Sequence, residues 1–177
     1  MIKNKHLVNL TVGLAKVTGF VPAWLLFKPK VRLAPGAKRQ LPKNCILMSN
    51  HTSLLDFALY LTVFPGRTIR FPMAEVLYNK GSAMAFLLDA LGGIRVDRDG
   101  KAFPFTVSTA FIATNTEAPI IPVYTGGNYG ISRRADVVIG APIYVSEHLQ
   151  PGLSRDEQLQ KLTDMLEKTV YDLKSYL

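Results

Sequence analysis

The chain has 177 residues, which is enough for one domain with a hydrophobic core but a tight fit for two. Hydrophobic residues make up 48% of the sequence and charged residues 19%, a composition that excludes a disordered chain. The 21 Lys and Arg residues outnumber the 13 Asp and Glu residues, and this surplus favours a polyanionic partner: a nucleic acid, an anionic membrane or a phosphorylated small molecule. The single cysteine, Cys45, excludes an intrachain disulfide framework.

Residues 7–27 are largely apolar and are flanked on both sides by basic residues. The apolar positions that recur at helical spacing are Leu7, Leu10, Leu14, Val17 and Val21. Lys16 falls on another face, and Pro22 is expected to kink or end the helix. We favour an amphipathic helix that lies in the headgroup region of a membrane and makes residues 1–30 a membrane-associating segment. An ordinary helix packed on the domain and a single transmembrane span are the alternatives.

Beyond residue 30, predicted strands and helices alternate along the chain. Residues 31–43, which are rich in proline and glycine, are predicted to form a loop. Short apolar runs bounded by turn-forming residues predict strands over 45–49, 68–72, 94–96, 120–124 and 135–139. Helices are predicted over 54–63, 78–91 and 111–114, and from Ser154 onward, where Glu157 completes a capping box pattern. This alternation predicts an α/β domain over residues 31–177 with a β-sheet covered by helices.

The segment Asn50–Asp56 (Asn-His-Thr-Ser-Leu-Leu-Asp) follows the 45–49 strand and places a histidine five residues before an aspartate. His51 is a candidate general base for an acceptor hydroxyl, and Asp56 could accept a hydrogen bond from the other ring nitrogen and fix its tautomer. In one continuous helix the two side chains would lie about 140° apart. The pairing therefore requires His51 in the loop after the strand and Asp56 in the first turn of the helix. In the alternative, Ser53–Asp56 is only a capping box and His51 is a turn residue.

The segment Gly92–Arg98 (Gly-Gly-Ile-Arg-Val-Asp-Arg) combines two glycines with two arginines. A guanidinium offers a planar fork of donors that suits a phosphate, so Arg95 and Arg98 are candidate phosphate ligands. Gly92 and Gly93 permit a tight turn and the close approach of a ligand. The alternative is a helix C-cap glycine followed by a polar edge strand whose arginines make surface ion pairs.

In their order and rough spacing, these segments resemble the motifs of the glycerolipid acyltransferases of the HxxxxD type, which include the 1-acylglycerol-3-phosphate acyltransferases. Asn50–Asp56 is similar to the first motif of that family, Gly92–Arg98 to the second, Ala118–Val123 to the fourth and Val137–Ile143 to a downstream segment. The resemblance implies a glycerol-3-phosphate acyltransferase-like α/β fold with a mixed β-sheet. It also implies transfer of an acyl group from acyl-CoA or acyl-carrier protein to a lysophospholipid or glycerol-phosphate hydroxyl in phospholipid biosynthesis.

The resemblance also assigns roles to single residues. It implies that His51 and Asp56 are catalytic, with no metal and no cofactor. The substrate-binding residues that it implies are Asn50, Gly93, Arg95, Arg98 and Pro122. We expect the chain at the cytoplasmic face of the cell membrane, bound to its anionic surface either peripherally or through a single helix. Nucleic acid is not an expected partner, because the basic residues are scattered and no base-stacking motif is present.

One family feature is missing between the second and fourth motifs. A third motif of the Phe-Pro-Glu-Gly-Thr type would lie between residues 99 and 117, where only Phe103-Pro104-Phe105 faintly resembles it. The domain over residues 31–177 is therefore predicted to lack a strand-loop segment of about 30 residues near residues 107–108. Loss of a central strand predicts an unpaired sheet edge. Two hypotheses stay open: an active acyltransferase and a membrane-bound inactive family member.

Overall fold

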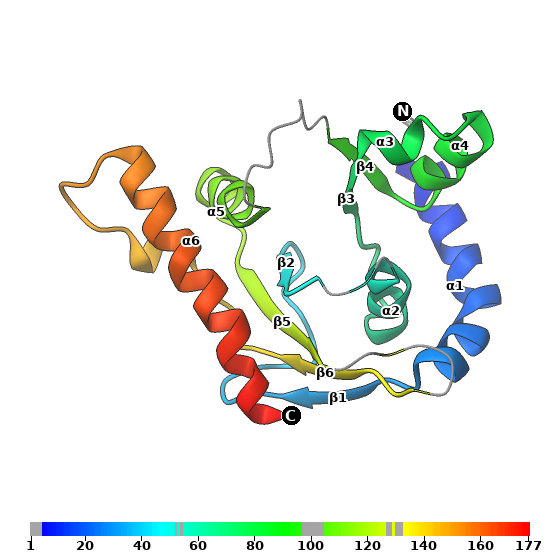
Figure 1. Ribbon diagram of the computed structural model, residues 1–177, viewed down its shortest axis with the longest axis horizontal. Helices are drawn as coiled ribbons and strands as arrows, with labels where there is room; N and C mark the ends of the chain where they lie inside the picture. The colour runs from blue at the N-terminus through cyan, green and yellow to red at the C-terminus, as the bar shows by residue number, and fades with distance from the viewer. Residues whose placement is uncertain (1–4, 52, 54, 97–104, 127–128, 130–132) are drawn as a thin grey trace. The chain divides into compact units, whose positions relative to one another are not determined.

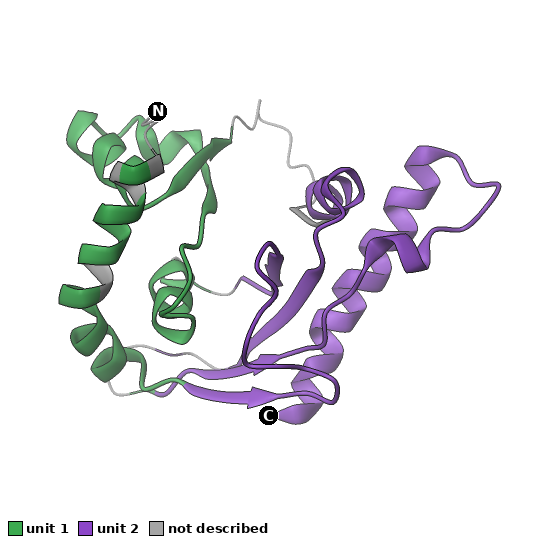
Figure 2. Ribbon diagram, turned by 180° about the vertical axis from the view of Figure 1, so that it is seen from behind, with its two compact units in different colours: residues 1–29, 53–101, 130–133 green, residues 30–52, 102–129, 134–177 purple. Residues whose placement is uncertain are grey.

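The computed structural model describes residues 5–51, 53, 55–96, 105–126, 129 and 133–177. The chain forms two compact units, which Figure 2 distinguishes by colour. Unit 1 comprises residues 1–29, 53–101 and 130–133, and unit 2 comprises residues 30–52, 102–129 and 134–177. Unit 1 therefore unites the N-terminal segment with a later stretch of the chain, and the chain passes from unit 2 to unit 1 within the Asn50–Asp56 segment.

Unit 2 contains a four-stranded sheet with the strand order β1-β6-β5-β2 (Figure 1). The pairs β1–β6 and β2–β5 are parallel and the pair β5–β6 is antiparallel, so the predicted mixed sheet is confirmed. The register places Ser49, the last residue of β2, beside Val123 of β5. The elements of unit 2 are β1 (Lys30–Leu33), β2 (Ile46–Ser49), α5 (Phe105–Thr116), β5 (Ile120–Gly126), β6 (Asp136–Ile139), the 3-10 helix η1 (Val145–His148), α6 (Arg155–Asp172) and the 3-10 helix η2 (Leu173–Tyr176).

Helices α5 and α6 pack against each other, and they contact β2 and β5 of the sheet (Figure 1). The buried side chains of the core between them are Met48, Ala110, Ala113, Ile120, Val145, Leu162, Leu166 and Val170. The start of α6 is as predicted, because Ser154 Oγ accepts the Glu157 N–H at 3.4 Å and the Glu157 carboxylate accepts the Ser154 N–H at 3.0 Å. Hydrogen bonds from the Ser154 hydroxyl and amide hold the pKa of Glu157 below its ordinary value.

The loop predicted over residues 31–43 is wrong at its start, because β1 occupies Lys30–Leu33. The β1 sequence, Lys-Val-Arg-Leu, alternates two cations with two apolar residues and is too short to give a clear strand signal. The strand forms through its pairing with β6, whose residues 137–139 are fully buried. Across this pair, Arg32 Nη1 lies 3.4 Å from Asp136 Oδ1. Tertiary pairing therefore decides the conformation of β1.

Unit 1 contains a two-stranded parallel sheet, in which Phe71 of β3 lies beside Gly93 of β4. The elements of unit 1 are α1 (Lys5–Phe27), α2 (Asp56–Val63), β3 (Phe71–Ala74), α3 (Glu75–Tyr78), α4 (Ser82–Ala90) and β4 (Gly93–Val96). The strand predicted over 68–72 is shifted toward the C-terminus. The helix predicted over 78–91 begins later, at Ser82, and Tyr78 is instead the last residue of α3. The two helices are separated at Gly81, where the chain turns with a φ of 135° that other residues rarely adopt.

The N-terminal helix α1 packs on α2 and α4 within unit 1, with Val12 and Phe27 buried. Pro22 does not end the helix, which continues to Phe27. A proline removes one amide donor from a helix, and at this exposed position water can satisfy the carbonyl left without a partner. In the described part of the chain, no helix is long and apolar enough to cross a membrane.

Four apolar side chains of α1 are exposed along one stripe. Their exposed fractions are 71% for Leu10, 63% for Leu14, 80% for Val17 and 61% for Val21. Trp24 and Leu25, at the C-terminal end of the helix, are also about half exposed. Leu10, Leu14, Val17 and Val21 are four of the five positions that recur at helical spacing in the sequence, and they do not pack into the core of unit 1. The side chain of the fifth, Leu7, lies outside the described residues.

Among the described strands, the four-stranded sheet has its two edges at β1, which pairs only with β6, and at β2, which pairs only with β5. The third motif would lie in the sequence between residues 99 and 117, and in this region β4 ends at Val96 and α5 begins at Phe105. Residues 97–104 between them, which include Phe103 and Pro104, lie outside the described residues. β2 is thus an edge strand, and it leads into the Asn50–Asp56 segment. The loss of a strand-loop segment near residues 107–108 stays a prediction.

Candidate active site

Asn50 directly follows β2 and is fixed to the neighbouring strand β5 by its side chain. Its amide nitrogen Nδ2 donates to the Thr125 carbonyl, and its oxygen Oδ1 accepts the Thr125 N–H, each at 2.9 Å. The side chain therefore pairs with both polar groups of the Thr125 backbone, as another strand residue would. This pairing anchors the point at which the chain leaves the sheet. A substrate-binding role for Asn50 stays a prediction.

His51 lies in the loop immediately after this anchor, at the carboxyl end of β2, as the sequence predicts. Its side chain is exposed, and its backbone φ is 31°, in the left-handed region. Histidine tolerates this region better than most residues, but the conformation still has a cost of about 1–3 kcal/mol. Such backbone geometry is typical of functional sites, and loops at the carboxyl ends of strands in α/β sheets are where ligands usually bind.

Asp56 is the first residue of α2 and is only 2% exposed. Its Oδ2 accepts the backbone N–H of Ser53 at 3.2 Å, while its own N–H donates to the Ser53 carbonyl at 3.1 Å. The Ser53 hydroxyl accepts the Leu55 N–H at 3.1 Å. One of the two hydrogen bonds of a capping box is therefore present, because the Asp56 carboxylate accepts the Ser53 N–H. Leu55, the residue before α2, makes no side-chain cap hydrogen bond.

The first turn of α2 is also held by packing inside unit 1. Phe57, the residue after Asp56, meets Phe71 of β3 edge-on, with ring centroids 6.2 Å apart. Asp56 is therefore a buried carboxylate on a fixed helix turn, with a backbone donor on one of its oxygens. The loop that joins it to His51 runs from unit 2 into unit 1, and residues 52 and 54 lie outside the described residues. The pairing of the two side chains stays a prediction.

Arg95 lies in the middle of β4 and has two neighbours from helix α3. Its Nη1 is 3.5 Å from Glu75 Oε1, and its guanidinium carbon is 4.6 Å from the centroid of the Tyr78 ring. The ion pair is open to solvent, with the Arg95 and Glu75 side chains 43% and 36% exposed. The surface ion pair of the alternative interpretation is therefore present. Arg98, the second predicted phosphate ligand, lies outside the described residues.

Gly93 is the first residue of β4, and the Tyr78 side chain leaves no space there for a larger residue. A Cβ at this position would collide with the Tyr78 hydroxyl and would lie 2.8 Å from the Leu88 carbonyl oxygen. Gly92, with a φ of 89°, makes the turn after α4. The two glycines thus have packing and turn functions in the structure, and the predicted approach of a ligand to Gly93 stays a prediction.

Tyr78 is a residue of this region that the sequence patterns did not single out. It is 3% exposed, and its hydroxyl has no hydrogen-bond partner among the described residues. Burial raises the pKa of its phenol, and the nearby Asp89 carboxylate raises it further, while Arg95 lowers it. Glu75 was missed as well. Each residue matters here through its contact with Arg95, and no local pattern reveals such a contact.

Pro122 is buried in the middle of β5, where it lies beside Met48 of β2. Its carbonyl accepts the Gly140 N–H at 2.8 Å, and a Cβ at Gly140 would lie 2.6 Å from its ring. Proline is rare in central strands because it lacks a donor for the ladder. Its contacts here are with neighbouring strands, and its predicted contact with substrate stays a prediction.

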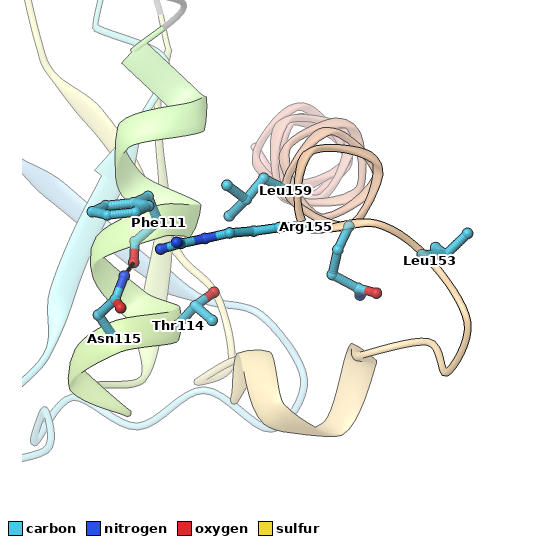
Figure 3. A pocket seen from close by; sticks show the side chains of 7 residues that line it. Phe111, Thr114, Asn115, Leu153, Arg155 and Leu159 are labelled. Atoms are coloured by element: carbon cyan, nitrogen blue, oxygen red, sulfur yellow. Dashed lines mark hydrogen bonds between the residues drawn. The ribbon is translucent and has the colours of Figure 1, made fainter.

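Two cavities of unit 2 involve none of the predicted site residues. One, of about 280 Å³, lies between α5 and α6, where the Arg155 guanidinium carbon is 5.0 Å from the centroid of the Phe111 ring (Figure 3). The other, of about 580 Å³, is lined by parts of the 36–42 loop with Ile121 and Tyr144. Among the described residues, no cluster of three or more His, Cys, Asp or Glu side chains could hold a metal ion.

The fold defines an α/β protein with a mixed sheet, in which Asn50 and His51 follow the carboxyl end of strand β2. No protein-family model and no curated protein matches the chain. Among solved structures, it is similar to the crystal structure of the 1-acyl-sn-glycerophosphate (LPA) acyltransferase PlsC from Thermotoga maritima. The TM-score is 0.54 and the sequence identity 20%, over 92% of this chain and 78% of that one. The chain therefore shares the fold of that acyltransferase.

Proposed function

We propose that this protein is an O-acyltransferase that moves an acyl group from acyl-CoA or acyl-carrier protein to the hydroxyl of a lysophospholipid or glycerol phosphate. The observation that carries the proposal is the position of His51. This histidine is exposed, has a left-handed backbone conformation and lies two residues after the end of the edge strand β2, in a fold similar to that of an LPA acyltransferase. The two hydrogen bonds between the Asn50 side chain and the Thr125 backbone support the proposal, because they fix the residue before His51.

In the proposed reaction, His51 accepts the proton of the acceptor hydroxyl as its oxygen attacks the thioester carbonyl. A carbon–oxygen bond forms, the carbon–sulfur bond breaks, and the leaving thiolate takes the proton from the histidine. Asp56 accepts a hydrogen bond from the other ring nitrogen and stabilises the imidazolium. The buried position of Asp56 suits this task, because its carboxylate is held on a helix turn away from bulk water.

Arg95 and Arg98 hold the phosphate of the acceptor in this proposal. The contact of Arg95 with the Glu75 carboxylate supports an anion-binding role, because a carboxylate and a phosphate use the same donors of a guanidinium. Both arginines belong to the Gly92–Arg98 segment, so a single short stretch of chain after α4 would supply the phosphate site.

We also propose that the protein binds the anionic, cytoplasmic face of the cell membrane through α1. The exposed stripe of Leu10, Leu14, Val17 and Val21 supports this proposal. Basic residues at the end of the helix, Lys28 and Lys30, are suited to anionic headgroups. A membrane-bound position would give the site direct access to lipid acceptors, which are held in the same surface.

The test is transfer of a labelled acyl group by the purified full chain. The donors are acyl-CoA and acyl-carrier protein, and the acceptors are lysophosphatidic acid and glycerol 3-phosphate. A reaction without acceptor controls for simple hydrolysis of the thioester. Acceptor-dependent formation of labelled product is the expected result, and its absence over the whole panel would contradict the proposal.

A second candidate, an inactive membrane-bound protein of this fold, is favoured by the missing third motif and the sheet edge at β2. The same preparation distinguishes the two. Binding to vesicles of anionic phospholipid without product for any donor and acceptor pair would support the inactive protein. Product formation would exclude it.

A further inference from the structure

Glu75, Tyr78 and Arg95 form a small cluster inside unit 1 that neither the sequence patterns nor the proposed reaction accounts for. Helix α3 begins at Glu75, directly after β3, and ends at Tyr78, so its single turn places both side chains on one side of the helix. Arg95 lies on the adjacent strand β4, where its register partner is Met73 of β3. The turn of α3 thus brings a carboxylate and an aromatic ring to one guanidinium.

Tyr78 is the rigid part of this cluster. It is almost fully buried, and its hydroxyl lies against Gly93, two residues before Arg95 on the same strand. The guanidinium stacks over the ring at 4.6 Å, which is cation–π distance. Within the described part of the chain, the hydroxyl itself makes no hydrogen bond. The direct contact of Tyr78 with Arg95 is therefore made by the ring face.

Glu75 is the member of the cluster whose contact with Arg95 another anion can replace. Its carboxylate is 3.5 Å from Arg95 Nη1, longer than a good hydrogen bond, and both side chains are more than a third exposed. Exposed ion pairs of this kind are weak. A phosphate dianion offers a stronger partner for the same planar fork of donors. An incoming phosphate would therefore displace this carboxylate without breaking any buried contact.

We propose that Glu75 is a displaceable resident anion on Arg95 and that Tyr78 is the positioning residue that holds the guanidinium while its anion is exchanged. This inference rests on the proposed role of Arg95 in phosphate binding. Glu75 competes with the acceptor phosphate, so it lowers the affinity for acceptor and leaves the chemical step unchanged. Tyr78 raises the affinity by keeping Arg95 ordered.

The experiment measures the Kd of glycerol 3-phosphate by calorimetry, and the KM and kcat for lysophosphatidic acid, in the full chain. Glu75→Gln is expected to lower Kd and KM by about two- to fivefold, the range of a weak exposed ion pair, with kcat unchanged. Tyr78→Leu is expected to raise both by about two- to fivefold, again without a change in kcat. Tyr78→Phe keeps the ring and is expected to match the wild-type protein.

Two further variants make the result specific. Glu147→Gln removes the same charge from an exposed position on η1 and is expected to leave Kd unchanged. In an Arg95→Ala background, Glu75→Gln is expected to have no effect, because the exchanged partner is gone. An unchanged or raised Kd in Glu75→Gln, or equal shifts in Glu75→Gln and Glu147→Gln, would overturn the inference.

Failure of the inference and failure of the proposed function look different in this experiment. If only the inference is wrong, Arg95→Ala weakens glycerol 3-phosphate binding while Glu75→Gln and Tyr78→Leu behave like the wild-type protein. If Arg95 has no part in phosphate binding, Arg95→Ala binds like the wild-type protein, or the wild-type protein does not bind at all. Either of these last results overturns the phosphate-binding role of Arg95 and the inference that rests on it, whereas failure of the proposed function is seen as the absence of acceptor-dependent product in the acyl-transfer assay.

Discussion

The Asn50 side chain and the Thr125 backbone make two hydrogen bonds of 2.9 Å, one in each direction, directly before His51. Because this contact is part-buried, removal of the Asn50 side chain would break two hydrogen bonds that are partly shielded from water. The strained φ of His51 follows immediately in the chain, so the contact also fixes the direction in which the loop leaves β2. A stability effect and an activity effect are therefore expected from one side chain.

Asn50→Ala is expected to lower the free energy of unfolding by about 1–3 kcal/mol and to reduce kcat, because the loop carrying His51 loses its anchor. Urea denaturation gives the first quantity and acyl transfer the second. Asn115→Ala is the matched control, since the Asn115 side chain donates to the Phe111 carbonyl on the exposed surface of α5. Equal destabilisation in the two variants would contradict a special role for the Asn50 contact.

Asp56→Asn separates the structural and chemical functions of the buried carboxylate. The amide oxygen of asparagine can still accept the Ser53 N–H, so the free energy of unfolding is expected to change by less than about 1 kcal/mol. The amide cannot stabilise an imidazolium as a carboxylate does, so kcat is expected to fall by at least about 100-fold. A variant that is both stable and fully active would show that Asp56 only caps α2.

Tyr78→Phe tests the buried hydroxyl through pH. Burial raises the pKa of this phenol, so folding favours its neutral form. The stability linked to Tyr78 is fully present below the ordinary pKa of tyrosine, about 10, and is lost as pH rises through the raised pKa of the folded protein. The wild-type protein is therefore expected to lose more stability than Tyr78→Phe above pH 10, and to match it or fall slightly below it at pH 7. The same difference in free energy of unfolding between the two proteins at pH 7 and above pH 10 would refute this.

Val17→Glu tests the membrane surface of α1. Val17 is 80% exposed and lies on the apolar stripe, so its substitution is not expected to affect folding of unit 1. Loss of one apolar side chain from the membrane is expected to weaken sedimentation with anionic vesicles at least about tenfold. Asn9→Glu adds the same charge to an exposed position of α1 off the stripe. Equal loss of binding in both variants would mean that charge alone governs the interaction.

The sequence predicts the features of this fold that depend on local pattern. The apolar run before Asn50, the loop position of His51 and the first-turn position of Asp56 all follow from short-range signals. β1 could not be predicted, because its conformation depends on β6, about 100 residues away in the sequence. Glu75 and Tyr78 escaped notice for a similar reason, since their contacts with Arg95 arise only when α3 and β4 come together.

The most direct test of the central claim compares two histidine substitutions in the labelled acyl-transfer assay. His51→Ala removes the proposed base, and His148→Ala removes an exposed histidine at the end of η1. We predict that kcat falls by at least about 100-fold in His51→Ala and changes less than about twofold in His148→Ala, with both variants folded by circular dichroism. Wild-type turnover by His51→Ala would contradict the account.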